Sequence, residues 1–149
     1  MTLAQDMLLV SEVQFVELKK LLQHEEYDPI YLKELTDEIV LDKALKYAIV
    51  IDKDTNIILD GVHRFNALKR LGCRKVPVIY LDYNSPLIKV DTWKKGLHLT
   101  KKDVVKAGLS GKKFSPKTSK HMIRNGDNTS HISTIEKEVN VSVDSLRTG

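Results

Sequence analysis

Apolar positions form short runs in some parts of the chain and a spacing of three to four residues in others, which predicts strands and helices together. The first run, Gln14 to Leu18, predicts a strand, and the residues from Leu21 to Tyr27 predict a loop. Asp28 with Pro29 is typical of an N-cap and first turn, and the apolar face that follows predicts a helix to about Leu41. The chain therefore opens with a strand, a loop and an amphipathic helix.

The next elements follow one another closely. Two short, largely β-branched runs, Ala48 to Asp52 and Ile57 to Asp60, are separated by turn residues and predict a hairpin. Gly61 closes the second run. Apolar residues then recur three positions apart and predict a helix up to Gly72, which suits a helix C-terminus. Val76 to Tyr83 predicts a further strand.

The second half of the chain is more polar and its elements are shorter. Leu87 to Trp93 predicts a strand, and a capping-box-like start at Thr100 predicts a short helix that ends near Gly108. Gly111 to Ser119 is expected to be a basic loop, followed by a polar, glycine-containing stretch. Alternating valines from Val139 to Val143 predict a final edge strand.

Composition places the chain among ordinary globular proteins. With 149 residues, 42% hydrophobic and 30% charged, it fits one domain. The single cysteine, Cys73, cannot form an intramolecular disulfide or a zinc knuckle. The longest early apolar run, Met7 to Val10, is far too short for a secretory core or a membrane span. We therefore expect a cytoplasmic protein without a membrane partner.

Charge is distributed unevenly. Between Lys94 and Arg124 there are ten Lys or Arg residues and one acid, Asp103, so this stretch carries +9 and the rest of the chain −5. Such a segment is expected to attract anions. Nucleic acid, a phosphorylated small molecule and a merely solvated lysine surface all remain open at this point.

The turn from Asp60 through Gly61 into the following helix is the strongest candidate site. Free backbone N–H groups and the positive end of the helix dipole face outward at a helix start. Gly61 would let a ligand approach the backbone, and Arg64 would add a bidentate clamp beside His63. The alternative is that Asp60 caps the helix while His63 and Arg64 are solvated.

The residues around this turn resemble a known family. Leu59 to Gly72, followed by Cys73 to Val78, looks like the core motif of the ParB/sulfiredoxin-like superfamily. The resemblance implies an α+β fold, a mixed sheet flanked by helices, in which this helix start holds nucleotide phosphates. It implies a single domain over residues 1–149, with a nucleotide-binding core at about 14–93 and a basic C-terminal segment with a closing strand at about 94–149.

Three branches of the superfamily differ in residues that can be checked here. Sulfiredoxins place a reactive cysteine before the His-Arg pair, where this chain has Val62, and Cys73 lies beyond the helix. Chromosome-partitioning proteins carry an arginine-rich motif and a helix-turn-helix domain, and neither is evident. The free serine kinases, which transfer a phosphoryl group from ADP or ATP to free L-serine, have a DGxHR motif like that from Asp60 to Arg64.

Further matches to the serine kinases span most of the chain. They are similar to this sequence at His24-Glu25, Thr92-Trp93, Pro116 to His121 and Val139 to Arg147. The known kinases are longer, with an extra subdomain before the final strand, where this chain has a few polar residues. The resemblance thus implies an enzyme that makes O-phospho-L-serine, with a serine pocket that is partly remade.

The resemblance also implies roles for individual residues. Glu25 would be the catalytic base, and a solvated loop acid is its alternative. Asp60 would hold Mg²⁺, and helix capping is its alternative. Trp93 and Val62 would contact the substrate, although Trp93 could equally be a core residue. The phosphate-binding residues implied are Gly61, His63, Arg64, Lys117, Thr118, Ser119 and His121; the last four could instead form a solvated basic loop.

Two other functions stay open. A nucleotide-gated, DNA-binding regulator would use the +9 segment on duplex phosphates, but no helix-turn-helix pattern is evident. A nuclease would need a cluster of acidic metal ligands, and the sequence shows only Asp60. Phosphorylation of free serine, with nucleotide, Mg²⁺ and serine as partners, is therefore the leading hypothesis.

Overall fold

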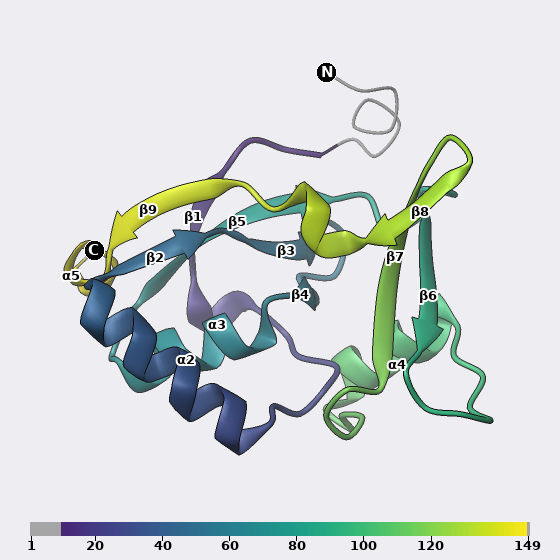
Figure 1. Ribbon diagram of the computed structural model, residues 1–149, viewed down its shortest axis with the longest axis horizontal. Helices are drawn as coiled ribbons and strands as arrows, with labels where there is room; N and C mark the ends of the chain where they lie inside the picture. The colour runs from purple at the N-terminus through teal and green to yellow at the C-terminus, as the bar shows by residue number, and fades with distance from the viewer. Residues whose placement is uncertain (1–9, 149) are drawn as a thin grey trace.

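The computed structural model describes residues 10–148, which form a central sheet, two smaller sheets and the helices around them (Figure 1). Apart from Val10, the apolar run Met7 to Val10 lies outside the described residues. Among the helices described, none has the length and apolar content needed to cross a membrane.

The central sheet has four strands in the order β1, β5, β3, β4. They are β1 (Gln14–Glu17), β5 (Lys75–Leu81), β3 (Ile49–Asp52) and β4 (Ile58–Asp60). β3 and β5 are parallel while the outer pairs are antiparallel, so the sheet is mixed, as expected. All four residues of β3 are buried, which explains an apolar run without polar alternation.

Three helices cover one face of this sheet: α2 (Pro29–Asp42), α3 (Val62–Arg70) and α5 (Val143–Arg147). α2 begins where the sequence predicts, because Asp28 Oδ1 accepts the backbone N–H groups of Ile30 and Tyr31 at 2.9 and 3.3 Å. α3 ends before Gly72, whose φ of +76° confirms the predicted helix end.

The opposite face packs against α4 (Lys101–Ser110) and a sheet of β6 (Ile88–Thr92), β7 (Ser119–Asn125) and β8 (Asn128–His131). These three strands are antiparallel. The remaining strands, β2 (Ala44–Tyr47) and β9 (Glu138–Ser142), form an antiparallel pair. Short 3₁₀ helices, η1 (Leu18–Lys20) and η2 (Ile132–Ile135), follow β1 and β8.

Several boundaries differ from the sequence predictions. The first strand stops at Glu17, and α4 continues past Gly108 to Ser110. Gly108 lies inside this helix and does not end it. A glycine is needed there because a Cβ would stand 2.6 Å from Ile57 Cδ1. Val143, expected in the final strand, instead begins α5. The short strand β2 and the β7–β8 hairpin were not predicted.

Candidate active site

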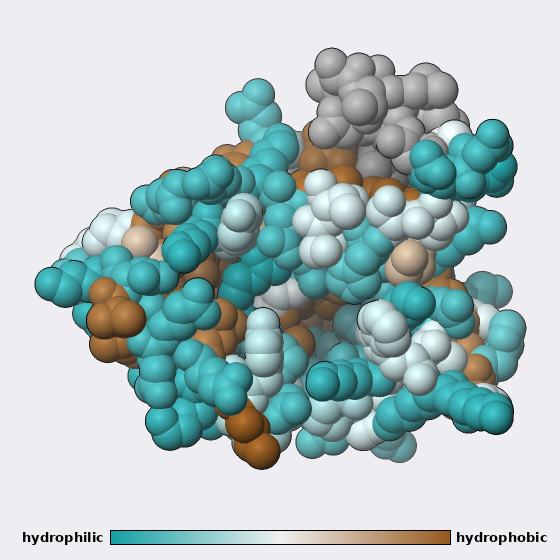
Figure 2. All heavy atoms as spheres, in the orientation of Figure 1, coloured by the Kyte–Doolittle hydropathy of each residue, from teal (hydrophilic) through white to brown (hydrophobic). Residues whose placement is uncertain are grey.

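A cavity of about 480 Å³ lies between the helical side of the molecule and the β7–β8–η2 region. The space-filling view shows this face hollowed near its middle, among mostly hydrophilic side chains (Figure 2). Every site residue predicted from the sequence lines it except Thr118. Cys73 does not; it is buried, with its thiol against the carbonyl of Val143.

Gly61 makes the turn from β4 into α3 possible. Its φ is +112°, and a Cβ at this position would stand 2.4 Å from Ile49 Cγ2. Packing alone therefore requires a glycine here, whether or not a ligand also needs one. No side chain caps α3, so the rival role of Asp60 as a helix cap is not found. The first-turn N–H groups of α3 are left to face the cavity, which suits an anion.

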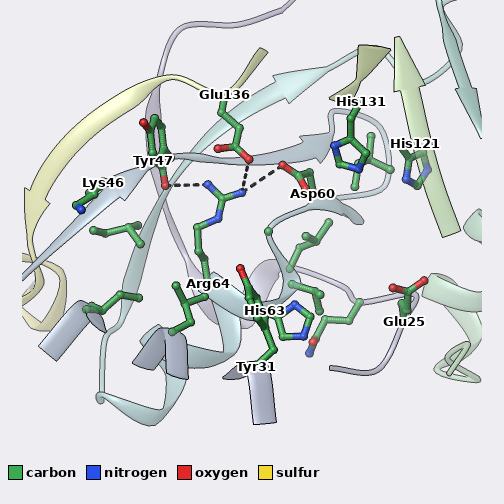
Figure 3. A pocket seen from close by; sticks show the side chains of 18 of the residues that line it. Glu25, Tyr31, Lys46, Tyr47, Asp60, His63, Arg64, His121, His131 and Glu136 are labelled. Carbon is green, nitrogen blue, oxygen red and sulfur yellow. Dashed lines mark hydrogen bonds and ion pairs between the residues drawn. The ribbon is translucent and has the colours of Figure 1, made fainter. Parts of the chain in front are cut away.

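Arg64 is bound on all sides by acceptors of the protein itself. Its Nη2 donates to Asp60 Oδ2 at 3.2 Å and to Glu136 Oε1 at 2.8 Å (Figure 3). Its Nη1 donates to the carbonyls of Ala48 and Tyr47 at 3.2 and 3.4 Å. Its side chain is only 14% exposed, so these contacts hold most of its donors, and the phosphate clamp that the sequence predicts stays a prediction. Two carboxyl groups, those of Asp60 and Glu136, share its Nη2.

Glu136 is a site residue that sequence reasoning missed. It lies 72 residues after Arg64, directly after η2, and reaches the site through the fold of the C-terminal segment. Burial, together with a hydrogen bond and the charge of Asp60, raises the pKa of Glu136 to about 7, while Arg64 opposes the shift. No spacing or motif in the sequence signals this contact.

His63 is fixed as a neutral hydrogen-bond donor. The backbone N–H of Asp28 donates to its Nε2 at 2.9 Å, and a backbone N–H can only donate, so the ring proton is on Nδ1. Burial lowers the pKa of His63, and the charge of Lys117 adds to this effect against that of Asp28. Among the described residues Nδ1 has no partner, so it is available to a ligand in the cavity.

Glu25 is held at the other end of the cavity by the start of β7. Its Oε1 accepts the backbone N–H groups of Thr118 and Ser119 at 3.1 and 2.7 Å and the Ser119 hydroxyl at 2.9 Å. Within the described part of the chain, Oε2 accepts no hydrogen bond. The backbone pairing of His24 and Glu26 with Phe114 fixes this loop. Glu25 is thus an oriented carboxylate and not a freely moving loop acid.

Two buried histidines, His24 and His121, pack against each other on the same wall of the cavity. The Ser119 hydroxyl donates its one hydrogen bond to Glu25. In the bond between His24 Nε2 and Ser119 Oγ, 2.8 Å apart, the Nε2–H must therefore be the donor. Burial lowers the pKa of His24 to about 4. Burial likewise lowers the pKa of His121 to about 3, and its Nε2 is 2.8 Å from the Tyr83 hydroxyl. His121 is therefore a buried, neutral ring on the cavity wall, and its expected phosphate contact stays a prediction.

The remaining predicted residues divide between structure and cavity wall. Thr118 is 2% exposed and its hydroxyl donates to the Ser115 carbonyl at 2.7 Å, which closes the loop; its expected phosphate contact stays a prediction. Lys117 is exposed and lines the cavity. Trp93 is 57% exposed, with Lys120 Nζ 4.4 Å from its ring centre, and is a wall residue, not a core residue.

Acidic groups outnumber basic ones around the cavity. Of the ten Lys and Arg residues between Lys94 and Arg124, all of which the structure describes, Lys117 alone lines the cavity. The acidic lining residues are Glu25, Glu38, Asp42, Asp60 and Glu136, and the basic ones are Lys46, Arg64 and Lys117. Among the described residues, no group of three or more His, Cys, Asp or Glu is arranged to hold a metal by itself. A polyanion would therefore need an accompanying cation to bind here.

Part of the chain is similar in sequence to proteins named L-serine kinases. No protein-family model matches the chain. It is 41% identical over 86 residues to the ATP-dependent L-serine kinase of Desulfurococcus mucosus, covering 55% of this chain and 34% of that protein. It is 34% identical over 83 residues to the ADP-dependent L-serine kinase of Thermococcus kodakarensis, covering 53% of this chain and 34% of that protein.

The fold of the chain is also similar to that of a solved serine kinase structure. A solved structure of a free serine kinase in complex with AMP superposes with a TM-score of 0.75 at 18% identity, covering 91% of this chain and 94% of that chain. The chain therefore has the α+β fold of a free serine kinase, and the resemblance read from its motif is confirmed. By sequence, the match spans about a third of the length of these curated relatives.

Proposed function

We propose that the cavity binds ADP or ATP with Mg²⁺ and transfers the terminal phosphoryl group to the hydroxyl of free L-serine, giving O-phospho-L-serine. One observation carries this proposal: an uncapped helix N-terminus and an oriented carboxylate, Glu25, open into the same cavity. Phosphoryl transfer needs both, since it depends on positioning, on stabilised phosphate oxygens and on a group that receives the hydroxyl proton. The names of the sequence relatives supply the acceptor.

The phosphates would bind at the start of α3. The free N–H groups of its first turn, the Nδ1–H of His63 and the ammonium of Lys117 are the donors available there. Arg64 contributes indirectly, because it holds Asp60 and the α3 start against β2 and β3. Val62 and Trp93 would form the wall near the acceptor.

The chemical step would use the free oxygen of Glu25. Oε2 accepts the proton of the serine hydroxyl as the serine oxygen forms its bond to the terminal phosphorus. The bond between that phosphorus and the bridging oxygen breaks, and AMP or ADP leaves with the electron pair. Because Oε1 is fixed by three donors, Oε2 can be aimed without first ordering the side chain.

Mg²⁺ fits the charge of this cavity. Asp60 would hold it, since Mg²⁺ commonly takes one or two carboxylates and the phosphates of a nucleotide. Bound there, it would neutralise phosphate oxygens that otherwise meet an acidic lining. Calorimetric titration with ADP should therefore give at least about tenfold weaker binding in EDTA than in Mg²⁺, equivalent to about 1.4 kcal/mol. Equal affinity in both buffers would contradict a metal role.

The function itself is tested by product formation. The protein is incubated with L-serine, Mg²⁺ and either ADP or ATP, and O-phosphoserine is measured by mass spectrometry, with D-serine and L-threonine as matched acceptors. Phosphoserine made from L-serine with at least one nucleotide is the expected result. Nucleotide binding without product, combined with nanomolar and sequence-dependent binding to duplex DNA at physiological salt, would favour a DNA-binding regulator.

A further inference from the structure

His131 lines the cavity although nothing around it in the sequence indicates a site. It is the last residue of β8 and the N-cap of η2, in a segment outside the recognised motif. Its ring lies on the cavity wall beside Asp60 and His121 (Figure 3). The β7–β8 hairpin thus brings an imidazole close to the residue that marks the phosphate end of the cavity.

The hydrogen bonds of this ring determine which nitrogen can bind a ligand. The backbone N–H of Ser133 donates to His131 Nδ1 at 3.1 Å, and the Ser133 hydroxyl lies 2.9 Å from the same atom. Since the backbone N–H can only donate, Nδ1 is an acceptor and the ring proton is on Nε2. Within the described residues Nε2 has no hydrogen-bond partner. His131 therefore presents an oriented and unused N–H group.

His63 shows the same design with the two nitrogens exchanged. A backbone N–H fixes one ring nitrogen as acceptor, and the other is left as a donor on the cavity wall. The cavity has few cations to offer a phosphate, because Arg64 is already bound by Asp60 and Glu136. Besides Lys117, fixed neutral donors are therefore needed to bind phosphate oxygens, and a hydrogen bond to such a charged oxygen is among the stronger kinds.

We infer that His131 is a phosphate-contact residue, whose Nε2–H donates to a phosphate oxygen of the bound nucleotide. This rests on the proposed function only in requiring a nucleotide in the cavity. It extends the phosphate site from the start of α3 to the C-terminal segment. It also gives η2 a functional reason for its N-cap, because the cap bond is what orients the ring.

Two substitutions separate ligand contact from helix capping. His131→Asn keeps an acceptor for the Ser133 N–H, since asparagine is a preferred N-cap, but it is too short to replace Nε2–H. His131→Gln can place an N–H near the position of Nε2 but is a poor cap. Affinity for ADP with Mg²⁺ is measured by calorimetry, adenosine serves as the ligand without phosphate, and thermal unfolding reports the cap.

We expect His131→Asn to unfold near the wild-type temperature and to bind ADP roughly tenfold or more weakly, as the loss of a hydrogen bond to a charged group implies. His131→Gln should be less stable but retain most of the ADP affinity. Adenosine should bind all three proteins alike.

Each contrary result has a distinct meaning. Wild-type affinity for ADP in His131→Asn would overturn the inference, as would a folded His131→Gln that binds as weakly as His131→Asn, or an equal loss of adenosine binding. A wild-type protein that binds no ADP would overturn the inference together with the proposed function. If the proteins bind ADP with the expected differences but the wild type makes no phosphoserine, the inference stands and the proposed kinase function is wrong.

Discussion

Ser119 binds Glu25 through two groups at once, its backbone N–H at 2.7 Å and its hydroxyl at 2.9 Å, both to Oε1. The same hydroxyl accepts from His24 Nε2 at 2.8 Å. This chain of bonds leads from a buried imidazole to one oxygen of the carboxylate and leaves the other oxygen for the ligand. It turns a glutamate in a loop into a group with a defined direction.

Replacing Glu25 by Gln should abolish most of the turnover. The amide oxygen of glutamine can still accept the three hydrogen bonds that fix Oε1, but the amide nitrogen in place of Oε2 cannot accept a proton. The loss of a general base typically costs about 10² to 10⁴ in rate. Steady-state formation of phosphoserine should show this loss in kcat, while ADP affinity stays within about twofold.

Glu26→Gln is the matched control. Glu26 is the next residue of the same loop, is exposed, and makes only a backbone bond to Phe114. Its variant should turn over like the wild type. If the Glu26 variant were the inactive one, or if both retained full activity, the assignment of the base would be wrong.

Ser119→Ala should affect the same carboxylate less severely. It removes one of the three donors to Oε1 and leaves the Nε2–H of buried His24 without an acceptor, which should lower the free energy of unfolding by about 1–3 kcal/mol. Urea unfolding measures this change, and kcat should fall by less than in Glu25→Gln. Ser145→Ala, at an exposed position of α5, is the control and should change neither quantity. If Ser119→Ala changed neither kcat nor the free energy of unfolding, the hydroxyl would not be what orients Glu25.

Arg64 is expected to matter for stability as much as for nucleotide binding. Arg64→Ala leaves Asp60 and Glu136 next to each other without the cation between them. Breaking such a largely buried pair costs about 3–5 kcal/mol in proteins, and the partial exposure of these groups, 14–18%, reduces it toward the lower value. The free energy of unfolding should fall accordingly.

The double variant Arg64→Ala with Glu136→Gln tests this explanation. Without Arg64, the half-buried Glu136 must either take up a proton beside Asp60 or keep a charge without its cation, and both are costly. Glutamine removes this cost, so the double variant should be more stable than Arg64→Ala alone, with a coupling energy of about 1–3 kcal/mol in a double-mutant cycle. Additive effects in that cycle would show that the two side chains act independently. A stable Arg64→Ala with greatly weakened ADP binding would restore the original expectation of a direct phosphate clamp.

What the sequence predicts correctly depends on short-range rules. Asp28 and Gly72 mark helix ends through their own backbone preferences, and the Asp60–Gly61 turn joins a strand to a helix within two residues. These signals are local, and so is the superfamily motif. The mixed central sheet does not follow from these local signals; it was implied by the resemblance of the motif to the superfamily, because the parallel pairing of β3 with β5 is a long-range contact.

The parts that could not be predicted rest on long-range contacts. β7 places the polar residue His121 in the interior beside Tyr83, so no alternation of polar and apolar residues marks it as a strand. β2 is stabilised by pairing with β9, nearly a hundred residues later. Glu136 and His131 reach the cavity only through this arrangement, which is why the sequence assigned the phosphate site to one turn and one basic loop.

The two buried histidines should make the fold sensitive to acid. In the unfolded chain a histidine titrates near pH 6.5, whereas burial lowers the folded pKa of His24 to about 4 and that of His121 to about 3. Above pH ~6.5 both states carry the same proton count and the full stability is present. As the pH falls below that value, the unfolded chain binds protons that the folded chain does not, so stability is lost progressively toward the folded pKa values. Each histidine should remove roughly 2 kcal/mol between pH 7.5 and 5. Glu136, whose pKa burial raises to about 7, offsets part of this loss because it takes up a proton in the folded protein over the same range. Urea unfolding at these two pH values measures the loss. His121→Gln should reduce the loss by the roughly 2 kcal/mol that one histidine contributes, although the variant is expected to be less stable at pH 7.5. If wild type and His121→Gln lost the same free energy of unfolding, His121 would be protonated in the folded protein, and the description of its ring as buried and neutral would be wrong.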